Sequence, residues 1–245
     1  MISMSQRKVR GIVTEAKKHG ENDKWLTILC KDAGMISAKA RGCRKPNSKL
    51  FACTSLFAYC DFIVDDHMRF TQVLSGDILY PFFAGCENID KISLGNFFLE
   101  VTNRFLKHGQ EDNEFMYLLL KALQAIDKNG DDLKSAGSIF VLRAMSAAGF
   151  MPYLDACIGC GSEQTAFFHP EGIVCSLCAQ KVRSVPVSDN TQKALADIAE
   201  ADVNKVFKLK FDEQTQNELW KCAEIMLKHY AEAPLRTYEL LDFMK

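Results

Sequence analysis

The sequence contains no long hydrophobic run. Its longest stretches without a charged residue, residues 50–60 and 144–154, are 11 residues each, whereas a membrane-spanning helix needs about 18. The first ten residues carry three basic side chains, but no apolar segment follows them as it would in a secretory signal. We therefore expect no transmembrane helix, no membrane partner and a cytoplasmic protein.

Motifs of the common catalytic sites are also missing. The 245 residues include no Gly-x4-Gly-Lys-Ser/Thr phosphate loop, no His-Glu-x2-His and no Gly-x-Ser-x-Gly elbow. Glycine (14) and proline (6) are scarce, and 48% of the residues are hydrophobic, as in globular chains. The missing motifs argue against an ATPase or a hydrolase of these types, and the composition predicts one or two domains that each bury a core.

Charge is distributed unevenly along the chain. The overall net charge is only −1, but residues 1–49 contain 12 Lys and Arg against 4 Asp and Glu, an excess of +8. We call residues 1–49 the basic head. The remainder carries a net charge of −9. Such asymmetry indicates a polyanionic partner for the basic head.

The first third of the chain has the pattern of a small β-barrel. Short apolar runs alternate with Gly-, Asn- and Asp-rich breaks that favour turns. The runs predict strands over residues 9–17, 25–30, 35–41, 57–64 and 70–79. Five strands in about 80 residues fit an open Greek-key barrel of the oligonucleotide-binding (OB) type, although SH3-like barrels and sandwiches fit nearly as well.

After residue 80 the apolar spacing becomes helical. Spacings of three and four predict helices over residues 92–106, 114–126, 133–150, 191–199 and 213–230. We therefore predict an α+β fold in which a barrel domain, residues 1–80, precedes a helical domain, residues 81–245. A metal-binding insert at about residues 153–182 interrupts the helices.

Four of the ten cysteines form two closely spaced pairs. The pairs are Cys157-x2-Cys160 and Cys175-x2-Cys178, separated by fourteen residues. Two such pairs can close a tetrahedron of thiolates around one Zn²⁺, with no position left for a water molecule. The spacing favours one structural zinc ion. An iron site, two disulfides or four free thiols are the alternatives.

Basic side chains accompany every predicted strand of the basic head. Lys39 and Arg41 lie two residues apart and so share one face of a strand. Trp25 is a candidate for stacking on an unpaired base, although an indole at a strand start is more often part of the core. The predicted DNA-binding residues are Arg7, Lys8, Arg10, Lys17, Lys18, Lys24, Trp25, Lys39, Arg41, Arg44, Lys45 and Lys49. A groove lined in this way would follow a phosphate backbone.

Two other functions are compatible with the residues. Asp65, Asp66 and His67 could bind a divalent ion in a nuclease, although their position between two strands favours a turn. A zinc-ribbon adaptor that binds only proteins would leave the basic head without a role.

Several segments resemble the RecO family of bacterial DNA repair and recombination mediators. The resemblance covers almost the whole chain. Residues 20–23, 34–37 and 40–50 are similar to the family's loops and arginine-rich segment. Residues 142–155, leading into the first cysteine pair, and residues 234–237 carry the remainder. Glu232 and Ala233 stand where a glycine and a basic residue are usual in the family.

The resemblance implies a mediator without enzymatic activity. Such a protein binds single- and double-stranded DNA, anneals complementary strands and, with RecR, helps load RecA onto DNA coated with single-stranded-DNA-binding protein. A bacterial, nucleoid-associated location is implied as well. The acidic, aromatic-ended tail of the single-stranded-DNA-binding protein needs an apolar pocket with a basic rim. Lys134, Phe140 and Arg143 are the candidates, with a core position as the alternative for Phe140.

Overall fold

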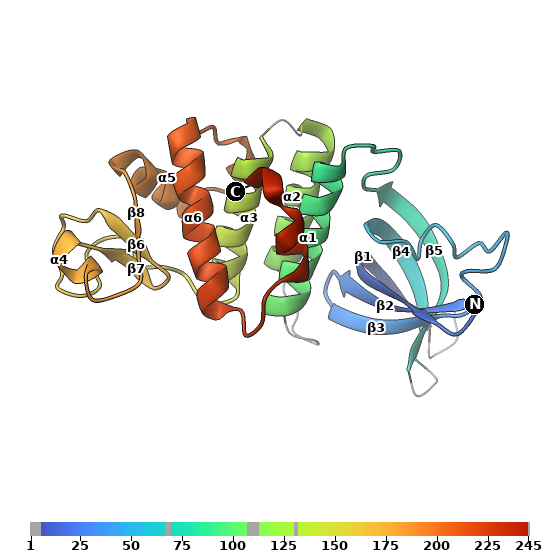
Figure 1. Ribbon diagram of the computed structural model, residues 1–245. Helices are drawn as coiled ribbons and strands as arrows, with labels where there is room; N and C mark the ends of the chain where they lie inside the picture. Colours follow the sequence, from blue (N-terminus) through green and yellow to red (C-terminus); the bar gives the residue numbers. More distant parts are fainter. Residues whose placement is uncertain (1–5, 67–69, 107–112, 130–131, 245) are drawn as a thin grey trace. The chain divides into compact units, whose positions relative to one another are not determined.

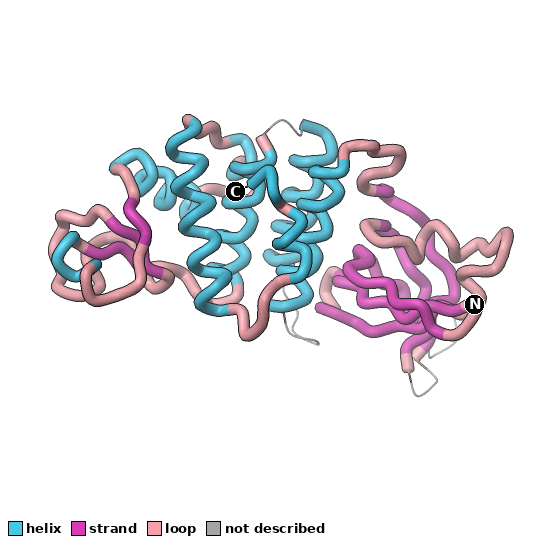
Figure 2. The backbone as a smooth tube through the Cα atoms, in the orientation of Figure 1, coloured by secondary structure: helices cyan, strands magenta, loops and turns pink. Residues whose placement is uncertain are grey.

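The computed structural model describes residues 6–66, 70–106, 113–129 and 132–244. The chain divides into two compact units, Met1–Glu87 with Leu106–Met116 and Asn88–Phe105 with Tyr117–Lys245. The first unit is mainly β-sheet and the second mainly helical (Figures 1 and 2), so the predicted α+β class is confirmed. Within the described ranges, no helix is long and apolar enough to cross a membrane.

A closed barrel forms the core of the first unit. Its strands are β1 (Gln6–His19), β2 (Asp23–Cys30), β3 (Gly34–Ala40), β4 (Ala58–Asp65) and β5 (Thr71–Pro81). The order around the barrel is β1-β2-β3-β5-β4, and β4 pairs back with β1. Only β3 and β5 pair in parallel. This five-stranded closure fits the predicted OB fold, and each predicted strand overlaps one of the observed strands.

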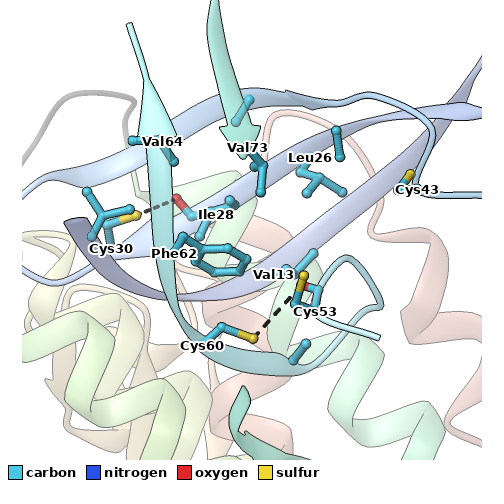
Figure 3. Close-up of a cluster of buried hydrophobic side chains, with 14 residues drawn as sticks. Val13, Leu26, Ile28, Cys30, Cys43, Cys53, Cys60, Phe62, Val64 and Val73 are labelled. Carbon is cyan, nitrogen blue, oxygen red and sulfur yellow. Dashed lines mark hydrogen bonds between the residues drawn. The ribbon is translucent and has the colours of Figure 1, made fainter. Parts of the chain in front are cut away.

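Alternate strand positions fill the barrel interior. Leu26 and Ile28 of β2 and Phe62 and Val64 of β4 are almost fully buried, two residues apart on each strand, as Figure 3 shows. Burying a side chain of this size stabilises a fold by about 1.5–3 kcal/mol. Four cysteines join this core, namely Cys30, Cys43, Cys53 and Cys60. Burial raises the pKa of Cys30 and of Cys60 to about 12, so both remain thiols at neutral pH.

Gly11 allows β1 to pair closely with both β2 and β4. It pairs with Cys30 of β2 and also with Cys60 of β4. A Cβ atom at this position would lie 2.7 Å from the Leu29 carbonyl oxygen and 2.8 Å from Cγ2 of Ile28. Because both contacts are shorter than real Cβ atoms allow, a side chain here would force the strands apart.

The second unit is built on α3 (Leu133–Ala147), which packs against α1 (Ile89–Phe105) and α6 (Glu213–Tyr230). Figure 1 shows these helices side by side. Phe98 of α1 lies 4.2 Å from Phe140 of α3, measured between ring centroids. Outside the insert, the other helical elements are α2 (Asn113–Asn129), α5 (Asp189–Glu200) and the 3₁₀ turns η1 (Val206–Lys208), η2 (Arg236–Leu240) and η3 (Asp242–Met244). The first four residues of α2 belong to the first unit. The five predicted helices are therefore confirmed.

A partly buried hydrogen-bond network joins the start of α5 to α6. The side chain of Ser188 caps α5 and accepts a bond from the Thr191 N–H. One carboxylate oxygen of Glu218 accepts bonds from the N–H and hydroxyl of Ser188 and from the Thr191 hydroxyl, at 2.7–2.8 Å. Partial burial raises the pKa of Glu218, but these donors and Gln214 lower it more strongly, to about 2.

This network predicts a pH dependence of stability. The folded pKa of Glu218, about 2, lies below the unfolded value of about 4.3. Glu218 therefore stabilises the fold fully above about pH 4.3, and this contribution is lost as the pH falls toward 2. We expect the difference in the free energy of unfolding between the wild type and Glu218→Gln to shrink between about pH 6 and pH 3. Urea unfolding followed by circular dichroism measures it, and a difference independent of pH would contradict the assignment.

The insert lies between α3 and α5. It contains β6 (Phe167–His169), β7 (Gly172–Val174), β8 (Val185–Pro186) and the short helix α4 (Ser176–Ala179). The strand order is β7-β6-β8. These elements are too short to produce a recognisable apolar period, and the sequence analysis did not predict them.

Candidate nucleic-acid interface and metal centre

Most basic residues of β1 form ion pairs. Their acidic partners lie on β4, just after β4, or on β1 itself. Arg10 lies opposite Asp61 in the strand register, and its Nε is 2.7 Å from one carboxylate oxygen of Asp61. Lys8 contacts the same carboxylate at 2.9 Å. Arg10 and then Lys8 hold the pKa of Asp61 well below its usual range. Arg7 pairs with Asp66 at 2.7 Å, and Lys17 pairs with Glu15 at 2.9 Å.

A second group of basic residues holds the loops together. Arg44 donates from Nη1 to the carbonyl oxygens of Gly20 and Glu21 in the β1–β2 turn. Asp23 contacts Nζ of Lys39 at 3.0 Å and accepts the N–H of Gly42 at 2.8 Å. These contacts fix the start of the loop between β3 and β4 against the β1–β2 turn.

Several other cations of the barrel are exposed. Lys18, Lys45 and Lys49 are exposed, and no carboxylate lies within 4 Å of their amino groups among the residues that the structure describes. Arg41 is also exposed, and its guanidinium lies 5.7 Å from the ring centroid of Phe70. These four cations belong to the twelve predicted DNA-binding residues, whereas Arg7, Lys8, Arg10, Lys17 and Lys39 each contact a carboxylate.

Two aromatic residues, Trp25 and Phe70, lie next to each other on the barrel. Trp25 is half-buried. Its ring centroid lies 5.9 Å from that of His19 and 5.4 Å from that of Phe70, both edge to face. Lys39 lies 6.0 Å from the Phe70 ring. Sequence reasoning did not select Phe70, although an aromatic residue at the start of a predicted strand beside a basic head was an available signal.

Of the two carboxylates proposed for a nuclease, that of Asp66 makes structural contacts. Besides its contact with Arg7, Asp66 accepts a hydrogen bond from the Thr71 hydroxyl at 2.7 Å. Its two oxygens therefore tie β1 and β5 together, as expected of a turn residue. His67 lies outside the described residues.

The structure changes the interpretation of the three partner-binding candidates. Phe140 is 0% exposed and packs on Phe98, so its side chain belongs to the helical core. Lys134 donates to Asn217 at 2.7 Å. Arg143 donates from Nη1 to the carbonyl oxygens of three residues at the end of α5, Ile198, Ala199 and Ala201. Periodicity alone could not place Phe140, because α3 is buried over most of its circumference.

The four cysteine sulfurs of the insert form one cluster. The Sγ atoms of Cys157, Cys160, Cys175 and Cys178 all lie within 4.8 Å of one another. Those of Cys160 and Cys175 are 3.7 Å apart. Four sulfurs each about 2.3 Å from a zinc ion would be separated by about 3.8 Å, so the spacing fits a tetrahedral metal site.

The backbone around the cluster also fits thiolate ligands. Cys175 donates its N–H to the Cys157 sulfur at 3.3 Å, and this bond is the main reason that the pKa of Cys157 falls to about 6. The neighbouring sulfur of Cys175 raises the pKa of Cys178 to about 12. Four adjacent thiolates thus repel one another unless a cation lies between them, and a bound metal ion would supply that positive charge.

Gly159 leaves space for one of these sulfurs. A Cβ atom at this position would lie 2.9 Å from the Sγ of Cys178. We predict that Gly159→Ala lowers metal affinity by about tenfold or more, because the displaced sulfur is one of the four that would bind the ion. Competition with a chromophoric chelator measures the affinity. Gly149→Ala, at a glycine outside the insert, is the control that should bind metal normally, and equal affinities in the two variants would refute the prediction.

Two family descriptions match consecutive parts of the chain. Residues 4–82 match the family description "Recombination protein O N terminal". Residues 86–239 match "Recombination protein O C terminal". The chain belongs to the RecO family. The first match covers the barrel strands, and the second covers the helices together with the cysteine cluster.

Individual RecO proteins align over nearly the whole chain. The DNA repair protein RecO of Acetivibrio thermocellus is 28% identical, over 99% of this chain and 97% of its own length. That of Alkaliphilus metalliredigens is 28% identical over 91% of both chains. That of Bacillus subtilis is 23% identical over 97% of this chain and 94% of its own length. RecO family membership supports a function in DNA repair and recombination.

Proposed function

We propose that this protein is a recombination mediator that binds single- and double-stranded DNA through its barrel and anneals complementary strands. Exposed cations on an OB barrel are the observation that carries the proposal. Lys18, Lys45 and Lys49 present positive charge, and Arg41 lies beside the Phe70 ring. Cations that follow a backbone next to aromatic rings are typical of single-strand binding without sequence preference.

Annealing follows from charge neutralisation. Two strands repel through their phosphates, and a protein that neutralises part of that charge lowers the barrier to pairing. The contacts of Arg44 and of Asp23 contribute indirectly, because they fix the loop that carries Lys45 and Lys49. We assign Arg44 and Asp23 a positioning role in DNA binding.

The cysteine cluster holds a structural zinc ion in this proposal. All four positions around the ion would be filled by sulfur, so the metal would stabilise the insert and carry out no chemistry. The insert core supports this role. It consists mainly of three of the cysteines with Phe167, Val174 and Ala179.

The helical unit is proposed to recruit proteins, namely RecR and the tail of single-stranded-DNA-binding protein, and thereby to help load RecA. An apolar surface beside Arg143, formed by Leu142, Pro152, Leu154 and Leu195, supports this proposal, because an acidic, aromatic-ended tail needs apolar contact next to a positive charge. Lys134, the second residue of α3, lies nine residues before Arg143, about 13.5 Å along the helix, so it would contact a different part of a bound peptide.

Annealing of DNA coated with single-stranded-DNA-binding protein tests the function. We expect this protein to accelerate pairing of a fluorophore-labelled strand with its quencher-labelled complement while both strands remain intact. Unchanged annealing rates would contradict the mediator function. Magnesium-dependent cleavage that disappears in Asp66→Ala would instead support a nuclease.

A further inference from the structure

The loop between β3 and β4 displays an exposed phenylalanine. The Phe51 side chain is 60% exposed, and it is the only Phe or Trp among the large exposed hydrophobic residues of the described chain. Exposing such a ring forgoes the stabilisation that burial would provide. Isolated exposed apolar residues are common, so its surroundings decide whether this ring has a role.

The backbone around Phe51 is held in place. Phe51 donates its N–H to the Ser48 carbonyl oxygen at 3.1 Å. Its own carbonyl oxygen accepts bonds from the hydroxyls of Thr54 at 3.2 Å and Ser55 at 3.1 Å. Lys24 of β2 donates to the Thr54 carbonyl oxygen at 2.9 Å and so ties this turn to the barrel. The ring is therefore presented from a fixed backbone, as a binding platform requires.

One cation lies at the ring, and two more belong to its loop. Nζ of Lys24 lies 5.8 Å from the ring centroid of Phe51, within the range of a cation–π contact. Exposed Lys49 is two residues away, and exposed Lys45 belongs to the same loop. A nucleotide that stacks its base on this ring would thus have amino groups near its phosphate.

Trp25, the residue that the sequence suggested for stacking, is less accessible. It is half-buried and already contacts two rings, those of His19 and Phe70. Phe51, by contrast, contacts no aromatic ring among the described residues.

We propose that Phe51 is a base-stacking site for an unpaired nucleobase and that it gives the barrel a preference for single-stranded over double-stranded DNA. The inference rests on the proposed DNA-binding function and adds a ligand contact to it. Bases within a duplex already stack on their neighbours, so only an unpaired base offers its face to the ring. All four bases have such a face, and the site therefore tolerates any sequence.

Fluorescence anisotropy with a labelled single strand and a matched duplex tests this site. We expect Phe51→Ala to weaken single-strand binding by about tenfold, while duplex affinity and the salt dependence stay close to those of the wild type. Phe51→Tyr retains a ring and should bind as the wild type does. Leu56→Ala is the matched control, because Leu56 is an aliphatic residue of the same loop that is 40% exposed.

Three outcomes would overturn the inference. They are unchanged single-strand binding by Phe51→Ala, equal losses on single strand and duplex, and an equal loss in Leu56→Ala. If Lys45→Ala and Lys49→Ala weaken binding while Phe51→Ala does not, stacking is refuted and the DNA-binding function stands. If the wild type binds neither DNA, the proposed function itself fails.

Discussion

Replacing Cys160 by alanine is expected to abolish stoichiometric metal binding and to unfold the insert while α1, α3 and α6 stay folded. Cys160 is exposed, so its removal leaves no cavity in a core, and the effect would come from the metal site. Segments of fewer than about 40 residues seldom fold without a metal or disulfides. Structural zinc contributes about 10–16 kcal/mol of apparent binding energy in small zinc domains.

Elemental analysis and limited proteolysis measure this outcome. The wild type should carry about one zinc ion per chain, and the variant should be cut within residues 153–186. Cys86→Ala removes a cysteine outside the cluster and should retain both metal and resistance to proteolysis. Full metal content in Cys160→Ala would show that the cluster is not a four-thiolate site.

The second large effect is expected from the exposed lysines of the barrel. The triple variant Lys18→Ala, Lys45→Ala, Lys49→Ala should bind single strands on the order of 100-fold more weakly at low salt. The slope of log K against log salt should fall by up to about 0.7 for each lost contact. The loss should be similar for every DNA sequence, because phosphate contacts carry no sequence information.

A matched control lies in the second unit. Lys205, Lys208 and Lys210 are exposed lysines around η1, and their replacement by alanine changes the net charge by the same amount. We expect this control to bind DNA nearly as the wild type does. Equal losses in both triple variants would mean that total charge, and not the barrel surface, determines the affinity.

Local patterns predicted the elements of this fold well. The barrel strands follow from two-residue alternation, as in Leu26 and Ile28, and both thiolate pairs of the metal site are contiguous motifs. The three-residue strands of the insert give no such signal. Phe140 could not be assigned to core or surface, because α3 is apolar on nearly every side.

Pairing between distant residues explains most of what the sequence could not predict in the DNA-binding site. Arg10 and Asp61 are 51 residues apart, and only the register between β1 and β4 brings them together. The basic head looked like a single electrostatic surface, but several of its charges are compensated by carboxylates or used to hold loops. Contacts such as those of Arg44 and Phe51 depend on the conformation of long loops, which periodicity does not determine.

The most direct test of the account is the affinity of the wild-type protein for a labelled single strand, measured by anisotropy over a salt series. The account predicts tight binding at low salt that is independent of sequence and weakens steeply as salt increases. Absence of binding at low salt would contradict the central claim that the barrel is a DNA-binding surface.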